Sequence, residues 1–200
     1  MEAVAGGRSY TQVARAKSQE RTRAALIDAA AEVFFSGRWE QVSLAEMALA
    51  AGVTKQTLLR HFGSKEGLLE QMLRYGFDLV RDQRWAAPTN DIDGAVDNLL
   101  DHYEQVGERS LVIGSGGGGS QAVAELGDSA RQLHYDWVEH VFGAWLERLR
   151  ANDRARCRAA LIALCDVQVW WLWSHDLGMP RAEVRATLVQ AIKRLLEEKT

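Results

Sequence analysis

The sequence predicts an all-α protein that has an N-terminal helix-turn-helix domain and a larger helical body, with about nine helices in all. Composition supports this prediction, because the only prolines are Pro88 and Pro180 and helix-favouring Ala, Leu, Arg, Glu and Gln predominate. Spacing supports it too, since apolar residues recur at helical intervals and rarely alternate as in strands. With 200 residues, 47% of them hydrophobic, the chain can build its core without metals or disulfides.

Charge is unevenly distributed along the chain. The net charge is −3, but residues 8–75 carry ten Lys or Arg against seven Asp or Glu, whereas residues 76–200 carry 14 against 19. The first third is therefore the basic part. No stretch approaches the roughly 18 consecutive apolar residues of a membrane span, so we expect a cytoplasmic protein that makes no membrane contact. Cys157 and Cys165 are expected to be reduced thiols in the core.

The chain begins with a segment that has basic residues but no apolar period. We therefore expect residues 1–17 to form a flexible basic arm, and residues 18–64 to form the first domain. Ser18 is a good capping residue, and the apolar spacing that follows predicts a first helix that ends near Ser36.

Two short helices around a glycine turn follow. Ser43 and Glu46 have the spacing of a capping box, in which each side chain accepts a hydrogen bond from the other residue's backbone, so a second helix is expected from there to about Ala50. Gly52 permits a tight turn in a left-handed conformation, and Thr54 caps a third helix.

Residues 65–200 are expected to form the body. A long helix over 65–86 is followed by a fifth helix that contains Val96 and runs into Ile113. The stretch Gly-Ser-Gly-Gly-Gly-Gly-Ser at 114–120 has the composition of a flexible engineered linker. Further helices are predicted over 128–150, over 155–176, which is apolar almost all round, and from Pro180 to the end.

The two short helices predict a function as well as a fold. In a helix-turn-helix, the first helix braces the second, whose N-terminal residues contact base edges in the major groove of DNA. At helical spacing, one outward face of the third helix carries Lys55, Gln56, Leu59 and Arg60. The alternative is that three short helices form a small packed subdomain on which these charges are merely solvated.

The segment from Val42 to Leu69, VSLAEMALAAGVTKQTLLRHFGSKEGLL, resembles the TetR-type transcription regulators. The matching features are Ser43, the Ala-Gly-Val turn at 51–53, Thr54, Leu58, the pair His61-Phe62 and Ser64-Lys65-Glu66. The resemblance implies a DNA-binding domain followed by a helical domain for ligand binding and dimerisation, with no cofactor.

The resemblance also implies which side chains contact DNA. Thr54, Lys55 and Gln56 would contact bases or nearby phosphates, and Lys55 and Gln56 suit guanine and adenine edges respectively. The contacts to phosphates would come from Ser43, Arg60, His61 and Lys65. Leu59 departs from the family, which commonly has a tyrosine that binds phosphate there, and we expect a contact to a thymine methyl group instead. For His61, a partly buried packing role is the alternative.

The body is expected to supply a dimer interface and a ligand pocket. Operators with two-fold symmetry are bound by dimers, and the last two helices are the expected interface, with Leu161, Val169, Trp173, Leu188, Ile192 and Leu195. A pocket for a hydrophobic, aromatic effector is predicted among Phe77, His102, Tyr103, His134, Trp137, Val141, Trp145 and Trp170, with His140 as a further polar group. Ordinary core packing explains the same aromatic residues equally well.

The function favoured by the sequence is a ligand-responsive regulator, most simply a repressor that a small apolar ligand releases from a palindromic operator. An enzyme is not expected, because no nucleophile, nucleotide or metal-helix motif occurs. Asp136 and His140 share a helical face, but two ligands are too few for a metal site, and an ion pair is expected there. The alternative function is a dimeric small-molecule-binding protein whose DNA binding is weakened, which Leu59 would allow.

Overall fold

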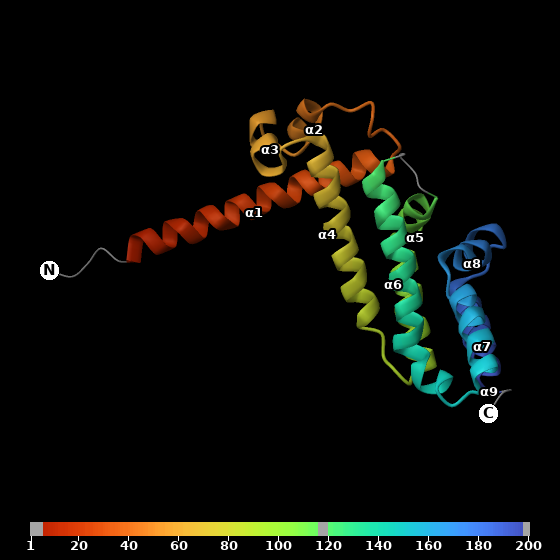
Figure 1. Ribbon diagram of the computed structural model, residues 1–200. Helices are drawn as coiled ribbons and strands as arrows, with labels where there is room; N and C mark the ends of the chain where they lie inside the picture. The colour runs from red at the N-terminus through yellow and green to blue at the C-terminus, as the bar shows by residue number, and fades with distance from the viewer. Residues whose placement is uncertain (1–5, 116–119, 198–200) are drawn as a thin grey trace. The chain divides into compact units, whose positions relative to one another are not determined.

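The computed structural model describes residues 6–115 and 120–197, and over these residues it contains helices and no strands, which confirms the all-α prediction (Figure 1). The chain divides into two compact units, Met1–Tyr75 and Gly76–Thr200. The boundary lies inside the helix α4 (Lys65–Trp85), whereas the sequence analysis placed it before that helix.

The first unit consists of α1 (Gly6–Phe35), α2 (Leu44–Ala50), α3 (Lys55–Phe62) and the beginning of α4. These helices bury one apolar face each, as the helical spacing predicts. The buried side chains of the unit are Leu26, Ile27, Ala30, Val33, Phe34, Trp39, Met47, Ala48, Leu58, Phe62, Leu68, Leu69, Met72 and Leu73.

The first helix begins earlier than expected. Because α1 starts at Gly6, the prediction of an arm without regular structure over residues 1–17 is wrong for residues 6–17, and residues 1–5 lie outside the described part. The physical reason is that Ala, Arg, Gln and Lys prevail between Arg8 and Ser18, and no proline or glycine interrupts them. Residues 13–20 are exposed, so this extension needs no apolar face.

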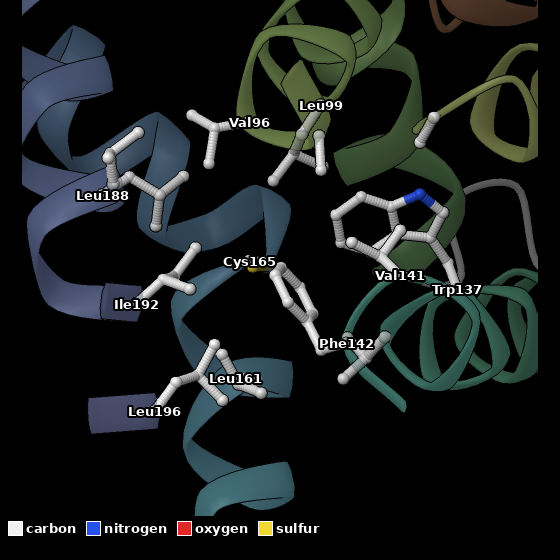
Figure 2. Packing of buried hydrophobic residues seen from close by; sticks show 14 of the residues in the cluster. Val96, Leu99, Trp137, Val141, Phe142, Leu161, Cys165, Leu188, Ile192 and Leu196 are labelled. Carbon is white, nitrogen blue, oxygen red and sulfur yellow. The ribbon is translucent and has the colours of Figure 1, made fainter. Parts of the chain in front are cut away.

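The second unit contains the rest of α4 together with α5 (Ile92–Gly114), α6 (Gln121–Leu146), α7 (Ala151–Leu164), α8 (Val167–Trp171), a π-helical turn η1 (Leu172–Asp176) and α9 (Arg181–Glu197). α7 and α9 lie side by side (Figure 1). Figure 2 shows Leu99 of α5, Phe142 of α6 and Ile192 of α9 facing a common interior, in which Cys165 also lies. Neither cysteine forms a disulfide with a described residue, and both are buried, as predicted.

Two helix boundaries of the body differ from the prediction. The helix expected over 128–150 begins at Gln121, because the Ser120 hydroxyl caps it by accepting from the Val123 N–H (3.3 Å), and it ends at Leu146. Ser120 is thus a helix cap and Gly114 the last residue of α5, while residues 116–119 of the predicted linker lie outside the described part.

The single helix expected over 155–176 is broken after Leu164. Asp166 has an extended backbone (φ −79°, ψ 148°) and caps the start of α8, where its carboxylate accepts from the Gln168 N–H at 2.8 Å. The apolar run over 155–176 favours one continuous helix, but Asp166 inside it caps a new helix and so divides the run.

A row of ion pairs joins α5 to α9. Arg185 donates to both carboxylate oxygens of Asp97, at 2.6 and 3.0 Å, and Lys193 pairs with Asp93 at 2.7 Å. Arg181 pairs with Asp101 at 2.6 Å and also with Glu104. These pairs fix the orientation of α9 against α5, although exposed pairs contribute little stability each.

The packing of α9 corrects half of the predicted dimer interface. Leu161, Leu188 and Ile192 are at most 3% exposed and belong to the core of a single chain, so they are not available to a partner. The apolar stripe of α9 is covered by α5 and α7 of its own chain. Val169, Trp173 and Leu195 are partly exposed.

At the boundary of the two units, α4 carries a glycine in its interior. Gly76 is the first residue of the second unit, and a Cβ atom built there would have nothing within 4 Å among the described atoms.

Candidate nucleic-acid interface

Local hydrogen bonds position α2 as the sequence predicts. The Ser43 hydroxyl accepts from the Glu46 N–H at 3.3 Å, and the Glu46 carboxylate accepts from the Ser43 N–H at 2.8 Å, so the predicted capping box is present. The hydrogen bond from the Ser43 backbone holds the pKa of Glu46 below its usual value. The Ser43 hydroxyl, which lies at the exposed start of α2, is therefore held in a fixed place.

A glycine turn and a second cap position α3. Gly52 has φ +70°, the left-handed conformation expected of it, and the Val53 N–H donates to the Ala48 carbonyl at 2.9 Å. Thr54 then caps α3, because its hydroxyl accepts from the Thr57 N–H at 3.2 Å. The two short helices and the turn between them are therefore confirmed.

The burial pattern gives α3 one buried and one exposed face. Leu58 is 0% and Phe62 6% exposed, and both belong to the core of the first unit. The exposed side chains are Thr54, Lys55, Gln56, Leu59 and Arg60. An open hollow on this face is lined by Thr54, Gln56, Thr57, Leu59 and Arg60. Lys55 and Arg60 give this face two cations, Gln56 gives it an amide, and none of its exposed residues is a carboxylate. Such a face suits a nucleic acid, which presents phosphates and the edges of its bases.

Leu59 is 37% exposed at the position where a tyrosine is common in the family that the segment resembles. It lies on the same exposed face as Lys55 and Arg60. A leucine there offers a methyl contact but no hydrogen bond.

Lys65 is partly engaged by the protein itself. Its ammonium donates to the Trp39 carbonyl and lies 5.2 Å from the centre of the Trp39 ring. The sequence analysis did not single out Trp39. Its contact is with Lys65, 26 positions away, and contacts of that range cannot be derived from local spacing. Lys65 therefore also ties the segment before α2 to the start of α4.

His61 is half-buried, and its ring lies 6.0 Å from that of Phe62. Its Nε2 atom is buried and has no hydrogen-bond partner. This position agrees with the packing alternative for His61 better than with an exposed phosphate contact.

The predicted pocket residues of the body pack as core. Trp137 and Val141 are at most 1% exposed, and His102, Tyr103 and Trp170 are at most 8% exposed. Phe77, His134 and Trp145 are half-buried. Tyr103 and Trp170 line a cavity of about 10 Å³, enough for roughly one water molecule.

The remaining predicted pair, Asp136 and His140, is not brought together. Asp136 accepts from the Gln132 amide at 2.7 Å, and His140 stacks on Trp85 with ring centres 5.4 Å apart. The expected ion pair between them is thus replaced by two separate contacts. No helix in the described parts of the chain combines the length and apolar character that crossing a bilayer requires.

Comparison with known families connects this geometry to a function. Residues 26–72, which contain the capping box, the glycine turn and α3, match the family described as "Bacterial regulatory proteins, tetR family". The resemblance of the first domain to TetR-type regulators is thus confirmed over residues 26–72. Proteins of that family are DNA-binding regulators.

Solved TetR-family structures have the same fold. A transcriptional regulator from Streptomyces coelicolor is 24% identical and superposes with a TM-score of 0.65, over 88% of this chain and 80% of its own. A regulator from Rhodococcus sp. Rha1 is 21% identical, with a TM-score of 0.61 over 91% and 97% of the two chains. The fatty acid degradation regulator FadR from Bacillus halodurans is 18% identical, with a TM-score of 0.57 over 87% and 94%. At these identities the likeness concerns the fold alone, and no curated protein matches the sequence.

Proposed function

We propose that this protein is a TetR-family, ligand-responsive transcriptional repressor, which acts in the cytoplasm as a homodimer on a palindromic operator. The observation that carries the proposal is the exposed face of α3, where Lys55, Gln56 and Arg60 lie together while Leu58 and Phe62 anchor the helix from behind. A helix with a cation and an amide at its N-terminal end, Lys55 and Gln56, and a second cation in its last turn, Arg60, suits recognition of a major groove.

Each exposed side chain has a role in the proposal. Lys55 binds guanine and Gln56 binds adenine, since their donors and acceptors match those base edges. Arg60 and the hydroxyl of Ser43 bind phosphates, and Leu59 contacts a thymine methyl group. Lys65 adds a phosphate contact with the donors that Trp39 leaves free, because an ammonium group has three.

Exposed apolar side chains of the body support the proposed homodimer. Leu172 and Leu177 are 45% and 63% exposed, and the neighbouring Trp173 is only partly covered. Such side chains close together at the end of a helix are best covered by another protein surface. We place Val169, Trp173 and Leu195 in the interface with them.

Fluorescence anisotropy with DNA from upstream of the protein's own gene tests the proposal. Lys55→Ala and Gln56→Ala should each weaken binding to the preferred site and relax the preference at one base pair, at a cost of about 1–3 kcal/mol. Arg60→Ala should weaken binding to all sequences and reduce the dependence on salt. Gln105→Ala and Arg148→Ala, which change exposed residues of the second unit, are the matched controls.

Equal effects of the α3 variants and of the controls would contradict the assigned roles. A wild-type protein that binds no natural duplex at low salt would favour the alternative, a dimeric small-molecule-binding protein. Leu59, which cannot donate a hydrogen bond to a phosphate, is the observation in favour of that alternative.

A further inference from the structure

Arg84, in the last turn of α4, is buried inside the body. Its side chain is 3% exposed, and its guanidinium carbon lies 4.0 Å from the centre of the Trp137 ring and 5.8 Å from that of Tyr103. The Trp137 indole N–H donates to the backbone carbonyl of Arg84 at 3.1 Å, which fixes this turn of the helix. An arginine in such a place is unusual, because arginines are almost never fully buried unless they are paired.

Two neutral groups accept hydrogen bonds from the guanidinium. The Tyr103 hydroxyl donates to the Cys165 carbonyl at 2.7 Å, and so its lone pairs accept from Arg84 Nη1 at 3.5 Å. The Nε2–H of His134 donates to the Ile162 carbonyl at 2.8 Å, which leaves Nδ1 to accept from Arg84 Nη2 at 3.3 Å. Both bonds to Arg84 are long, and its Nε–H is buried without any partner.

The charge of Arg84 is not compensated by an ion pair with any described residue. Burial lowers the pKa of His102 to about 3 and also lowers that of His134, and the positive charge of Arg84 contributes to both shifts. These imidazoles are therefore neutral. Asp166 is half-buried, but its carboxylate is used as the cap of α8. An arginine does not lose its proton, so a buried positive charge remains.

Tyr103, which accepts from Arg84, also lines a small cavity. It measures about 10 Å³ and is lined by Leu99, Leu100, Tyr103, Leu164, Asp166, Trp170, Trp173, Val184 and Leu188. Tyr103 thus connects the lining of the cavity to Arg84. Trp173 belongs to the π-helical turn η1 and is only partly buried. A ligand larger than one water molecule would have to displace Trp170 or Trp173 from this lining.

We propose that Arg84 binds the carboxylate of a monoanionic ligand, whose apolar part occupies the enlarged cavity among Tyr103, Trp170 and Leu188. The carboxylate would accept from Nε–H and from a free Nη–H in the two-point geometry that arginine and carboxylate share. This inference rests on the proposed function and deepens it, because it names the chemical class of the effector. Arg84 thus takes the place of His102 and His134 as the polar group that binds the ligand. Both imidazoles are neutral, and His134 already donates to the Ile162 carbonyl, so neither is expected to bind an anion strongly.

A carboxylate fits this site better than a phosphate does. The site offers one positive charge and two neutral imidazoles, which matches one negative charge, whereas a phosphate monoester carries between one and two at neutral pH. The nearby Asp166 would repel a second negative charge. The lining of the cavity is otherwise apolar.

Thermal unfolding and calorimetry with matched probes test the proposal. The probes are octanoate, 4-phenylbutyrate and 3-indolepropionate, each beside its primary amide, together with phenyl phosphate. For wild-type protein we expect at least one acid to raise the unfolding temperature and to bind roughly tenfold or more tightly than its amide. Phenyl phosphate should bind more weakly than that acid.

Variants show whether Arg84 is responsible. Arg84→Met should remove the preference for acid over amide, while Arg84→Lys should keep part of it, since it retains the charge without the two-point geometry. Arg81→Met is the matched control, because Arg81 lies on the same helix but is exposed and pairs with Asp78 and Asp82. Arg84→Lys also keeps the test decisive if Arg84→Met fails to fold by circular dichroism.

Three results would overturn the inference: no binding by any of the acids, equal binding of acid and amide, or an acid preference that persists in Arg84→Met. Tighter binding of phenyl phosphate would overturn the choice of a carboxylate. Anisotropy with operator DNA separates this inference from the proposed function. If an amide releases DNA as well as its acid does, the inference about Arg84 is overturned and the proposed function is supported. If an acid binds in an Arg84-dependent way but DNA stays bound, the inference is supported and release of DNA by the ligand is contradicted.

Discussion

Replacing Tyr103 with phenylalanine removes one oxygen atom from the centre of the body. The Tyr103 side chain is 5% exposed, and its hydroxyl donates to the Cys165 carbonyl at 2.7 Å, at the point where the chain breaks between α7 and α8. The ring can stay where it is, so the loss is confined to hydrogen bonding. The bond from Arg84 at 3.5 Å is long and adds little.

We expect the free energy of unfolding to fall by about 1–2 kcal/mol, because the Cys165 carbonyl would lose a short hydrogen bond inside the core. For a chain of this size, that corresponds to a fall of roughly 2–8 °C in the unfolding temperature. Calorimetry measures both quantities. Tyr135→Phe is the control, since Tyr135 is a half-buried tyrosine of the same unit. An unfolding temperature that does not change, or that falls equally in the control, would refute the assignment of the bond.

Three further predictions follow from local contacts. Ser43→Ala removes the capping box of α2 and should destabilise the first unit by about 1 kcal/mol in urea unfolding, whereas Ser43→Asp, which can also cap, should not. Burial lowers the pKa of His102 from 6.5 to about 3 in the folded protein, so the unfolded chain takes up a proton on this residue at a higher pH than the folded chain does. The free energy of unfolding should therefore fall as the pH falls from about 6.5 towards 3. His102→Gln should lessen that loss in acid titrations followed by circular dichroism. Arg185→Ala removes the ion pairs with Asp97 and Asp93 on a partly exposed surface. The free energy of unfolding should fall by at most about 1 kcal/mol in low salt, and by less in 1 M salt, where ion pairs are screened. A fall that salt does not change would indicate packing by the aliphatic part of the arginine side chain instead.

The two short helices that carry the proposed DNA-binding surface could be predicted from sequence because their determinants are local. Ser43 and Glu46 are three positions apart, as are Thr54 and Thr57, and the glycine at 52 marks the turn between the two helices. Contacts of this range depend on residue types and spacing alone. The faces of α3 follow from the helical period for the same reason.

The body was harder to predict because its determinants are far apart in the chain. An apolar stripe shows that a helix face is covered but not by what, so Leu188 and Ile192 were assigned to a partner subunit when α5 and α7 of the same chain cover them. Asp166 is a residue type that often caps helices, and it does cap α8. The apolar residues on both sides of it nevertheless favoured one continuous helix in the sequence analysis.

Arg84 could have been noticed from sequence. It follows Leu73, Phe77 and Val80 at helical spacing, so it continues the apolar stripe of α4 towards the interior. A lone cation on such a stripe usually extends to the surface. Only the contacts with His134 and Trp137, which are 50 and 53 positions away, show that it is held inside.

Gly76, one of the two glycines of α4, lies where one unit ends and the other begins. Glycine costs a helix interior about 1 kcal/mol relative to alanine, and no neighbouring atom within 4 Å among the described ones demands its small size. The connecting helix therefore bends most cheaply at this residue. An alanine would fit at this position and would stiffen the helix there.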